Sequence, residues 1–156
     1  MKIITKSEKE TFEIAKNFTA TLKGGEALCL IGELGSGKTV FAKGIAKGLG
    51  IKKIITSPTF VLMKVYPVKY PAQRRGAPKA LFNGVNQFIH IDAYRLNRGK
   101  DLEAIGAKDY LNNKNCVTVI EWADRVKDIL PKKRIMIEFK VLGYDKREIL
   151  IKKIIK

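Results

Sequence analysis

Polar and apolar positions alternate with a helical spacing in two stretches of the first fifty residues. Ser7, with Glu10 three residues later, forms a capping box ahead of the inward-facing positions 11, 14, 15, 18 and 22, which predicts a helix over residues 7–22. Phe41, Ile45 and Leu49 recur every four residues. Gly50 follows as a plausible C-terminal cap, so a second helix is predicted after residue 38.

Short apolar runs predict the strands of a sheet. The run EALCLI (26–31) lies between the two helices and predicts a buried strand. Two further runs, FIHID (88–92) and CVTVIEW (116–122), contain a carboxylate at or next to their ends, and DLEAIGAKDYL (101–111) between them predicts a short helix. Strand and helix patterns therefore alternate along the middle of the chain.

The remaining segments predict one more strand and a hairpin. ITSPTFVLMKVY (55–66) predicts a loop followed by an extended strand. RIMIEFKVL (134–142) and REILIKKII (147–155) flank the turn GYDK and predict a C-terminal β-hairpin. Residues 67–87 are rich in Pro, Gly and Arg without periodicity and predict a surface loop.

This order of elements predicts an α/β fold. Because a glycine-rich segment separates the strand 26–31 from the helix that follows, we expect a three-layer sandwich of the P-loop NTPase type. Its central sheet should be mostly parallel, with the C-terminal β-hairpin added. Neither a repeat nor a linker interrupts the sequence, so residues 1–156 are predicted to form a single domain.

Composition limits the expected localisation of the protein and the kinds of site it can contain. The sequence has no run of 18 apolar residues and its first residues are too charged for a secretory signal, so we expect a cytoplasmic protein without a membrane span. Cys29 and Cys116 lie in apolar runs and are predicted to be buried, reduced thiols. His90 is the only histidine, which leaves no basis for a His-based metal site or a His-dependent triad.

The excess of positive charge is compatible with a nucleic-acid partner but does not by itself indicate one. Thirty-one Lys and Arg residues against 15 Asp and Glu residues give a formal charge of +16. The basic residues are mostly lysines scattered among isoleucines, as in a general usage bias. The one local concentration, PVKYPAQRRGAPK (67–79), lies in the predicted surface loop.

The segment GELGSGKT (32–39) carries the most specific chemistry. It matches G-x-x-x-x-G-K-[ST] completely and stands between a predicted strand and a predicted helix. Glycines let backbone N–H groups turn toward phosphate oxygens, and the helix N-terminus adds a positive dipole. Lys38 would reach the β- and γ-phosphates, and the Thr39 hydroxyl would ligate Mg²⁺. A nucleoside triphosphate is therefore the expected ligand.

Two acids are candidates for organising the metal and the attacking water. Asp92 ends the run FIHID, and Glu121 ends the run CVTVIE. Carboxyl ends of parallel strands meet at the edge that holds the phosphate loop, so both side chains are expected there. The alternative for each is a solvated acid at a strand terminus.

The nucleotide and its use are less sharply specified. The guanine-recognition string Asn-Lys-x-Asp is missing after the loop, the nearest string being NNKN (112–115), so ATP is favoured. Three functions remain open at this point: an ATPase, a small-molecule phosphotransferase (kinase), and a non-hydrolysing nucleotide-binding assembly module. Arg95 and Arg98 could serve a kinase lid, although no lid helix follows them.

Taken together, the motifs resemble those of one family. SEKETFEIA, GELGSGKT, TSPTF, HIDAYRL, DLEAIGAKDYL and IEWADR occur in the order and spacing of the bacterial TsaE (YjeE) family. The resemblance covers nearly the whole chain. It implies a P-loop ATPase with ATP and Mg²⁺ as cofactors, required for the tRNA modification N6-threonylcarbamoyladenosine at position 37. It also implies partners similar to TsaD and TsaB, and tRNA contacted directly or through the complex.

The resemblance also implies roles for single residues. The phosphates would be wrapped by the loop, and the metal would be held by Thr39 and Glu121. Lys38, Asp92 and Glu121 would be the catalytic residues, with Asp92 at the γ-phosphate region or orienting the attacking water. The loop residues concerned are Leu34, Gly35, Ser36, Gly37, Lys38 and Thr39.

Four further residues follow from the same resemblance. Thr59 would belong to a nucleotide-sensing switch. Glu8 and Arg147 would lie along the nucleotide, and Asp124 would lie near the end of the strand after Trp122. Trp122 could stack on a ligand or be part of the core.

In one place the sequence departs from the family pattern. The stretch between Tyr66 and Phe88 is longer and more basic than the usual hairpin connection. It is either a tolerated surface insertion, which we favour, or an added contact to tRNA or to the partner complex.

Overall fold

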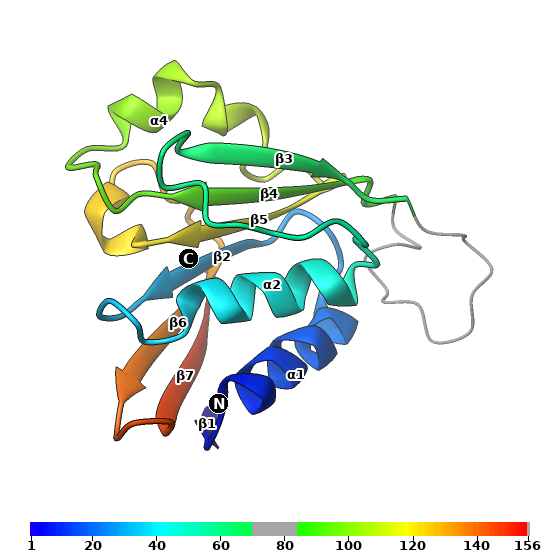
Figure 1. The fold of residues 1–156 in the computed structure, drawn as a ribbon. Coiled ribbons are helices and arrows are strands. Elements are labelled where there is room, and N and C mark those ends of the chain that lie inside the picture. The colour runs from blue at the N-terminus through cyan, green and yellow to red at the C-terminus, as the bar shows by residue number, and fades with distance from the viewer. Residues whose placement is uncertain (70–83, 156) are drawn as a thin grey trace.

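One mixed sheet contains every strand of the described chain. The structure, a computed structural model, describes residues 1–69 and 84–155. Its strands are β1 (Lys2–Thr5), β2 (Ala27–Ile31), β3 (Met63–Pro67), β4 (Gln87–Asp92), β5 (Cys116–Glu121), β6 (Arg134–Val141) and β7 (Arg147–Ile154), in the order β1-β7-β6-β2-β5-β4-β3 (Figure 1).

The centre of the sheet is parallel and its two sides are antiparallel. β6, β2, β5 and β4 run parallel to one another. β3 pairs antiparallel with β4, β7 with β6, and β1 with β7. The predicted mostly parallel sheet is therefore correct only for the four central strands, and the predicted C-terminal hairpin is confirmed as β6–β7.

Helices cover both faces of the sheet unequally. α1 (Glu8–Phe18) and α2 (Lys38–Gly48) pack along each other on one face, whereas α4 (Lys100–Ala104) lies on the other (Figure 1). The part of the chain that the structure describes also has three 3-10 turns: η1 (Thr19–Thr21), η2 (Ala107–Asp109) and η3 (Ala123–Val126). The face covered by α4 thus has a thinner helical layer than the face covered by α1 and α2.

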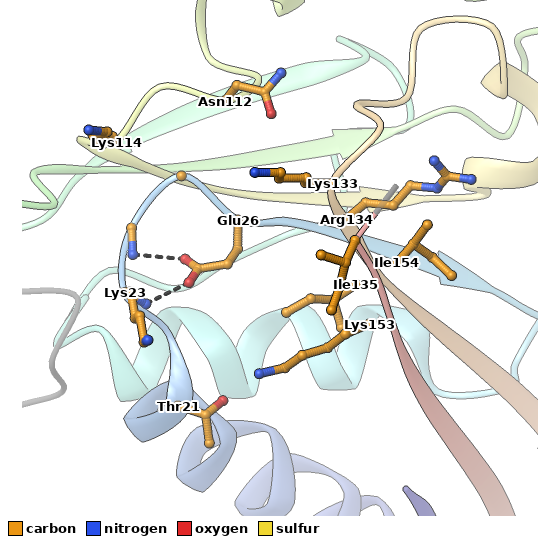
Figure 2. A pocket seen from close by; sticks show the side chains of 13 residues that line it. Thr21, Lys23, Glu26, Asn112, Lys114, Lys133, Arg134, Ile135, Lys153 and Ile154 are labelled. Atoms are coloured by element: carbon orange, nitrogen blue, oxygen red, sulfur yellow. Dashed lines mark hydrogen bonds between the residues drawn. The ribbon is translucent and has the colours of Figure 1, made fainter.

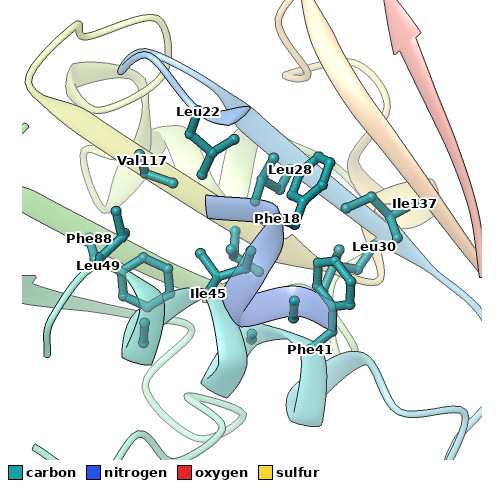
Figure 3. Close-up of a cluster of buried hydrophobic side chains, with 14 of the residues drawn as sticks. Phe18, Leu22, Leu28, Leu30, Phe41, Ile45, Leu49, Phe88, Val117 and Ile137 are labelled. Carbon is teal, nitrogen blue, oxygen red and sulfur yellow. The ribbon is translucent and has the colours of Figure 1, made fainter. Parts of the chain in front are cut away.

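The two faces have separate hydrophobic clusters. Beneath α1 and α2, Phe41 of α2 packs edge-on against Phe139 of β6, with ring centroids 5.6 Å apart. Figure 3 shows this cluster, in which side chains of both helices meet those of the central strands. Burial of these side chains, at about 25 cal/mol per Å² of apolar surface, fixes α2 over the sheet and with it the loop that precedes α2.

The first two predicted helices are confirmed, with small differences at their ends. The Ser7 hydroxyl accepts a hydrogen bond from the amide of Glu10 at 3.1 Å, whereas the Glu10 carboxylate accepts from Lys6 rather than from Ser7. Gly50, at φ 83°, follows α2 in a left-handed conformation. The Gly50 and Ile51 amides donate to the carbonyls of Lys47 and Ala46, which is a Schellman end.

Three predictions about elements need correction. β1 has no counterpart among the predicted strands. The single helix predicted over 101–111 is two short turns, α4 and η2, because Gly106 between them adopts φ 81°. Pro67 and Gln87, expected in the surface loop, are paired residues of β3 and β4, and residues 70–83 of that loop lie outside the described residues.

Both cysteines are buried thiols, as predicted. Burial raises the pKa of Cys29 to about 12 and also raises that of Cys116. Within residues 1–69 and 84–155, no helix has the length and apolar character needed to cross a bilayer.

Candidate functional site

The glycine-rich loop and the two predicted acids meet at one edge of the sheet. Residues 32–37 connect the carboxyl end of β2 to the first residue of α2. Asp92 and Glu121 are the last residues of β4 and β5 and are register partners in that parallel pair. The parallel centre of the sheet therefore brings together groups that are up to 89 positions apart in the sequence (32 and 121).

The loop needs glycine where its backbone turns closely against the sheet. Gly32 has φ 155°, and a Cβ there would lie 2.8 Å from the carbonyl oxygen of Phe139 and from the Ser36 hydroxyl. Gly37, the residue before α2, has φ 103°. Residues with a side chain rarely adopt either conformation, so these two glycines set the path of the loop around the start of the helix.

Lys38 folds back into this loop. Its ammonium donates to the carbonyl oxygens of Gly32 and Glu33 at 2.8 and 2.7 Å, and lies 3.9 Å from the centroid of the Trp122 ring. The residue is only 4% exposed. Burial lowers the pKa of Lys38, an effect opposed by the carboxylates of Glu121, Asp92 and Asp124. A phosphate could replace the two carbonyls as the partner of this cation.

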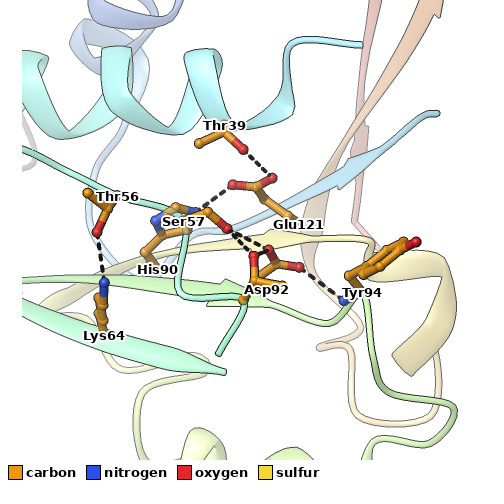
Figure 4. A network of polar contacts seen from close by, with 9 residues as sticks. Thr39, Thr56, Ser57, Lys64, His90, Asp92, Tyr94 and Glu121 are labelled. Carbon is orange, nitrogen blue, oxygen red and sulfur yellow. Dashed lines mark hydrogen bonds and ion pairs between the residues drawn. The ribbon is translucent and has the colours of Figure 1, made fainter. Parts of the chain in front are cut away.

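Glu121 links the helix α2 to the strand β4. Its Oε2 accepts a hydrogen bond from the Thr39 hydroxyl at 2.8 Å, and its Oε1 lies 2.7 Å from Nε2 of His90 (Figure 4). Both His90 and Glu121 are buried, and Nδ1 of His90 has no hydrogen-bond partner within residues 1–69 and 84–155. The carboxylate is thereby held with one oxygen toward α2.

Asp92 is hydrogen-bonded to the segment that precedes β3. Its Oδ2 accepts a hydrogen bond from the Ser57 hydroxyl at 2.6 Å (Figure 4). The same oxygen accepts a second one from the Thr59 hydroxyl at 2.7 Å. Its Oδ1 accepts from the backbone amide of Tyr94 at 3.0 Å. The predicted switch residue Thr59 is thus tied to the predicted catalytic acid.

These groups line one cavity of about 360 Å³, which contains most of the predicted site residues. The loop residues are accompanied by Glu8 of α1, by the two acids, by Ser57 and Thr59, and by two aromatic residues, Tyr94 and Trp122. The predicted residues that line it are Glu8, Leu34, Gly35, Ser36, Gly37, Lys38, Thr39, Thr59, Asp92 and Glu121.

Two of the predicted residues lie outside this cavity. Arg147 borders an adjoining depression together with Glu8 and Asp145, and its Nη2 donates to the carbonyl of Gly35 at 3.2 Å. It therefore lies beside the loop and supports it from the hairpin. Asp124 is exposed in η3 and does not line the cavity, although it is near enough to affect the pKa of Lys38.

Trp122 follows Glu121 directly and adopts a left-handed conformation, with φ 58°. It is half-buried and lines the cavity. Its ring also lies 5.0 Å from that of Tyr94, and the guanidinium of Arg125 lies 5.6 Å away. Trp122 thus covers Lys38 at the cavity wall instead of lying wholly in the core.

Sequence reasoning did not assign site roles to Ser57, His90 and Tyr94. His90 and Asp92 are two positions apart on one strand, so their side chains share a face, and this alternation could have placed His90 beside the site. No local pattern could show that Ser57 bonds to a carboxylate 35 residues later.

The oxygens of Thr39 and Glu121 fit the requirements of a magnesium ion. A hydroxyl and a carboxylate 2.8 Å apart are the kind of oxygen ligands that Mg²⁺ takes from a protein when substrate phosphates and waters supply the rest. Both groups are beside Lys38 and the loop, where those phosphates would lie.

Comparison with known proteins identifies the family. The family model described as "Threonylcarbamoyl adenosine biosynthesis protein TsaE" matches residues 5–149. The tRNA threonylcarbamoyladenosine biosynthesis protein TsaE of Bacillus subtilis is 38% identical over 93% of this chain and 80% of its own length. The protein of the same name from Treponema pallidum is 35% identical over 97% and 99%.

A solved structure agrees with this assignment. The crystal structure of YdiB from Bacillus subtilis superimposes with a TM-score of 0.74 and 34% identity, covering 99% of this chain and 85% of that one. With the family model matched over residues 5–149, these similarities show that the chain belongs to the TsaE family of threonylcarbamoyl adenosine biosynthesis proteins.

Proposed function

We propose that this chain is a Mg²⁺-dependent ATPase of the P-loop type that acts in the synthesis of N6-threonylcarbamoyladenosine in tRNA. It would do so as a nucleotide-dependent switch on partners similar to TsaD and TsaB. The observation that carries the proposal is the meeting of Lys38, Thr39, Asp92 and Glu121 in one cavity at the start of α2.

Each group has a distinct part in this proposal. The Lys38 ammonium would exchange the carbonyls of Gly32 and Glu33 for the β- and γ-phosphates of ATP. Thr39 and Glu121 would hold Mg²⁺, which neutralises charge on the phosphates when it is bound. Asp92 would orient the water that attacks the γ-phosphorus, with ADP as the leaving group.

The contact between Asp92 and the segment 57–59 supplies a means of switching. Hydroxyls of Ser57 and Thr59 donate to the same carboxylate oxygen. A γ-phosphate nearby would compete with Asp92 for these two donors, and a water would compete with them for the carboxylate oxygen. The next residues, Phe60 and Val61, are 85% and 57% exposed. A change at Asp92 could thereby alter a surface available to partner proteins.

The first test is the effect of Lys38→Ala on the binding of a non-hydrolysable ATP analogue, measured by calorimetry. Charge-assisted hydrogen bonds contribute about 1.5–3 kcal/mol each, so affinity should fall roughly 100-fold or more. The exposed Lys127→Ala is the matched control and should bind normally. If Lys38→Ala binds as tightly as the wild type, the phosphate-loop assignment is wrong.

Hydrolysis is then measured as Mg²⁺-dependent phosphate release with and without partners. Binding without release, even with partners present, would favour the assembly-module alternative. A rise in ADP production that depends on a small-molecule acceptor would favour a phosphotransferase.

A further inference from the structure

A second cavity of about 360 Å³ lies at the opposite edge of the sheet from the phosphate loop (Figure 2). It is bounded by the turns that precede β2 and β5, by the start of β6 and by the end of β7. Because β2 rises about 3.3 Å per residue over five residues, the two cavities are separated by roughly 17 Å of strand. No contact described for the nucleotide site involves this edge.

The second cavity is strongly basic. Five of its lining residues are cationic: Lys23, Lys114, Lys133, Arg134 and Lys153. They come from four segments of the chain that together line one pocket; Figure 2 labels all five side chains. We call these residues with their neighbours the basic pocket.

Among the described residues that line the basic pocket, the one acid is already engaged with the backbone. The carboxylate of Glu26 accepts hydrogen bonds from the amides of Lys23 and Gly24 at 2.6 and 2.8 Å (Figure 2). Among the described residues, Lys114, Lys133 and Lys153 have no carboxylate within 4 Å. All three are exposed, so their charges are directed to whatever enters from solvent.

We propose that the basic pocket binds the phosphate backbone of RNA. This deepens the proposed function and rests on it for the identity of the RNA, the tRNA to be modified. The chemistry of the pocket does not depend on it. Lysine ammonium groups on flexible stems act as point charges for phosphates, and each phosphate that they neutralise releases counterions.

The lining favours RNA over a small anion. Arg134, the one side chain suited to bidentate phosphate binding, donates to the carbonyls of Pro131 and Lys132 instead. The amides of Lys23 and Gly24 are taken by Glu26, which leaves lysines rather than a rigid cradle. Spread charges of this kind suit a repeating phosphate chain.

Uncharged groups in the pocket favour RNA over an acidic protein surface. The Asn112 amide can hydrogen-bond to ribose hydroxyls or base edges, and the Thr21 hydroxyl, which donates to the carbonyl of Phe18, can accept a hydrogen bond from a ribose hydroxyl. Ile135 and Ile154 form an apolar floor against which a sugar or base can pack.

The test measures binding of a labelled tRNA transcript by anisotropy from about 50 to about 200 mM KCl. The variant carries Lys114→Glu, Lys133→Glu and Lys153→Glu. Its control carries Lys9→Glu, Lys127→Glu and Lys140→Glu, three exposed lysines outside the pocket with the same change in net charge. A third protein with glutamine at the three pocket positions separates loss of contact from repulsion.

We expect the pocket variant to bind at least roughly tenfold more weakly, with a salt slope reduced by about one per lysine. The glutamine variant should reduce the slope equally, whereas the control should keep it. Equal slopes for pocket variant, control and wild type would overturn the proposal. So would displacement of the tRNA by polyglutamate at matched charge, or tight binding of pyrophosphate that the pocket variant loses while tRNA binding persists.

Two further measurements separate this proposal from the proposed function. The pocket variant should bind the ATP analogue like the wild type, because its substitutions are at the other edge of the sheet. Lys38→Ala should bind tRNA like the wild type. Failure of the ATP experiment alone therefore leaves the RNA site standing, and failure of the RNA experiment alone leaves the ATPase standing.

Discussion

The contact between Lys38 and Trp122 makes the site observable in solution. Trp122 is the only tryptophan, and its ring centroid is 3.9 Å from the Lys38 ammonium. Phosphates that draw Lys38 away from the ring should change the indole fluorescence. Titration with the ATP analogue should therefore give a saturable change, which Lys38→Ala should lack. A constant spectrum at a saturation established by calorimetry would mean that Trp122 does not sense the nucleotide.

Replacement of Glu121 and replacement of Asp92 should impair different steps. Glu121→Ala removes a proposed metal ligand and the partner of Thr39, so Mg²⁺-dependent binding should weaken. Asp92→Ala keeps the metal ligands but removes the group that orients water. It should bind the ATP analogue and hydrolyse ATP roughly 100-fold more slowly.

Phosphate release and calorimetry on the same samples distinguish these outcomes. The exposed carboxylate of Asp101 on α4 supplies the matched control, Asp101→Ala, which should leave both quantities unchanged. Normal hydrolysis by both site variants would show that neither acid is catalytic.

Among single residues, the sequence predicts the place of those that are positioned by local geometry. Lys38 and Thr39 follow from motif spacing, and Asp92 and Glu121 follow from strand ends in a parallel sheet. Ser57 and Arg147 reach their partners Asp92 and Gly35 only through the folded chain, so no spacing specifies them. That the predicted residues hold nucleotide and metal stays a prediction until the measurements above are made.

The packing of α1 against α2 depends on a small residue at their crossing. A Cβ at Gly44 would lie 2.5 Å from the carbonyl oxygen of Phe12 and 2.6 Å from Cβ of Ala15. Alanine would raise the helix propensity of α2 by up to about 1 kcal/mol. Overpacking costs about 1–3 kcal/mol, and here it also affects the backbone of α1, so Gly44→Ala should lower the free energy of unfolding.

Urea unfolding of Gly44→Ala checks this prediction. Gly143→Ala is the control, because a Cβ at Gly143 would meet only Cβ of Lys146, at 3.9 Å, and the residue does not need a positive φ. If Gly44→Ala is as stable as the wild type or more so, α1 and α2 can move apart without a loss in the free energy of unfolding.

Helices and strands were predictable where their own residues show a periodic or apolar pattern. α1, α2 and β5 each show a clear period or apolar run, and the structure confirms them. β1 has four residues, of which only Thr5 is buried, so its side-chain pattern is too short to detect. It is a strand because β7 supplies its antiparallel partner, a contact across nearly the whole chain. Strand order, and hence the mixed sheet, is likewise set by long-range pairing.

At the scale of the whole molecule, the cavity at the start of α2 would have little room for a second substrate beside a nucleotide. Its volume of about 360 Å³ is near the lower end of the range for ligand pockets, and the triphosphate would take much of it. The groups around Asp92 lead instead to an exposed segment at Phe60. Hydrolysis energy would then go into an association cycle, in which γ-phosphate and Mg²⁺ hold a segment that relaxes after cleavage.

The last prediction follows from this arrangement: the protein alone should be a slow ATPase whose effect appears only with partners. A reconstitution with proteins similar to TsaD and TsaB, threonylcarbamoyl-AMP and tRNA should show repeated rounds of modification only when both this protein and ATP are present. The number of modified tRNA molecules per complex is the measurement. Lys38→Ala should stop after the first round, because it lacks the cation that holds the phosphates, whereas Lys127→Ala should continue. If wild type and Lys38→Ala support the same number of rounds, ATP hydrolysis at this site does not drive the cycle, and a phosphotransferase becomes the better explanation of the cavity.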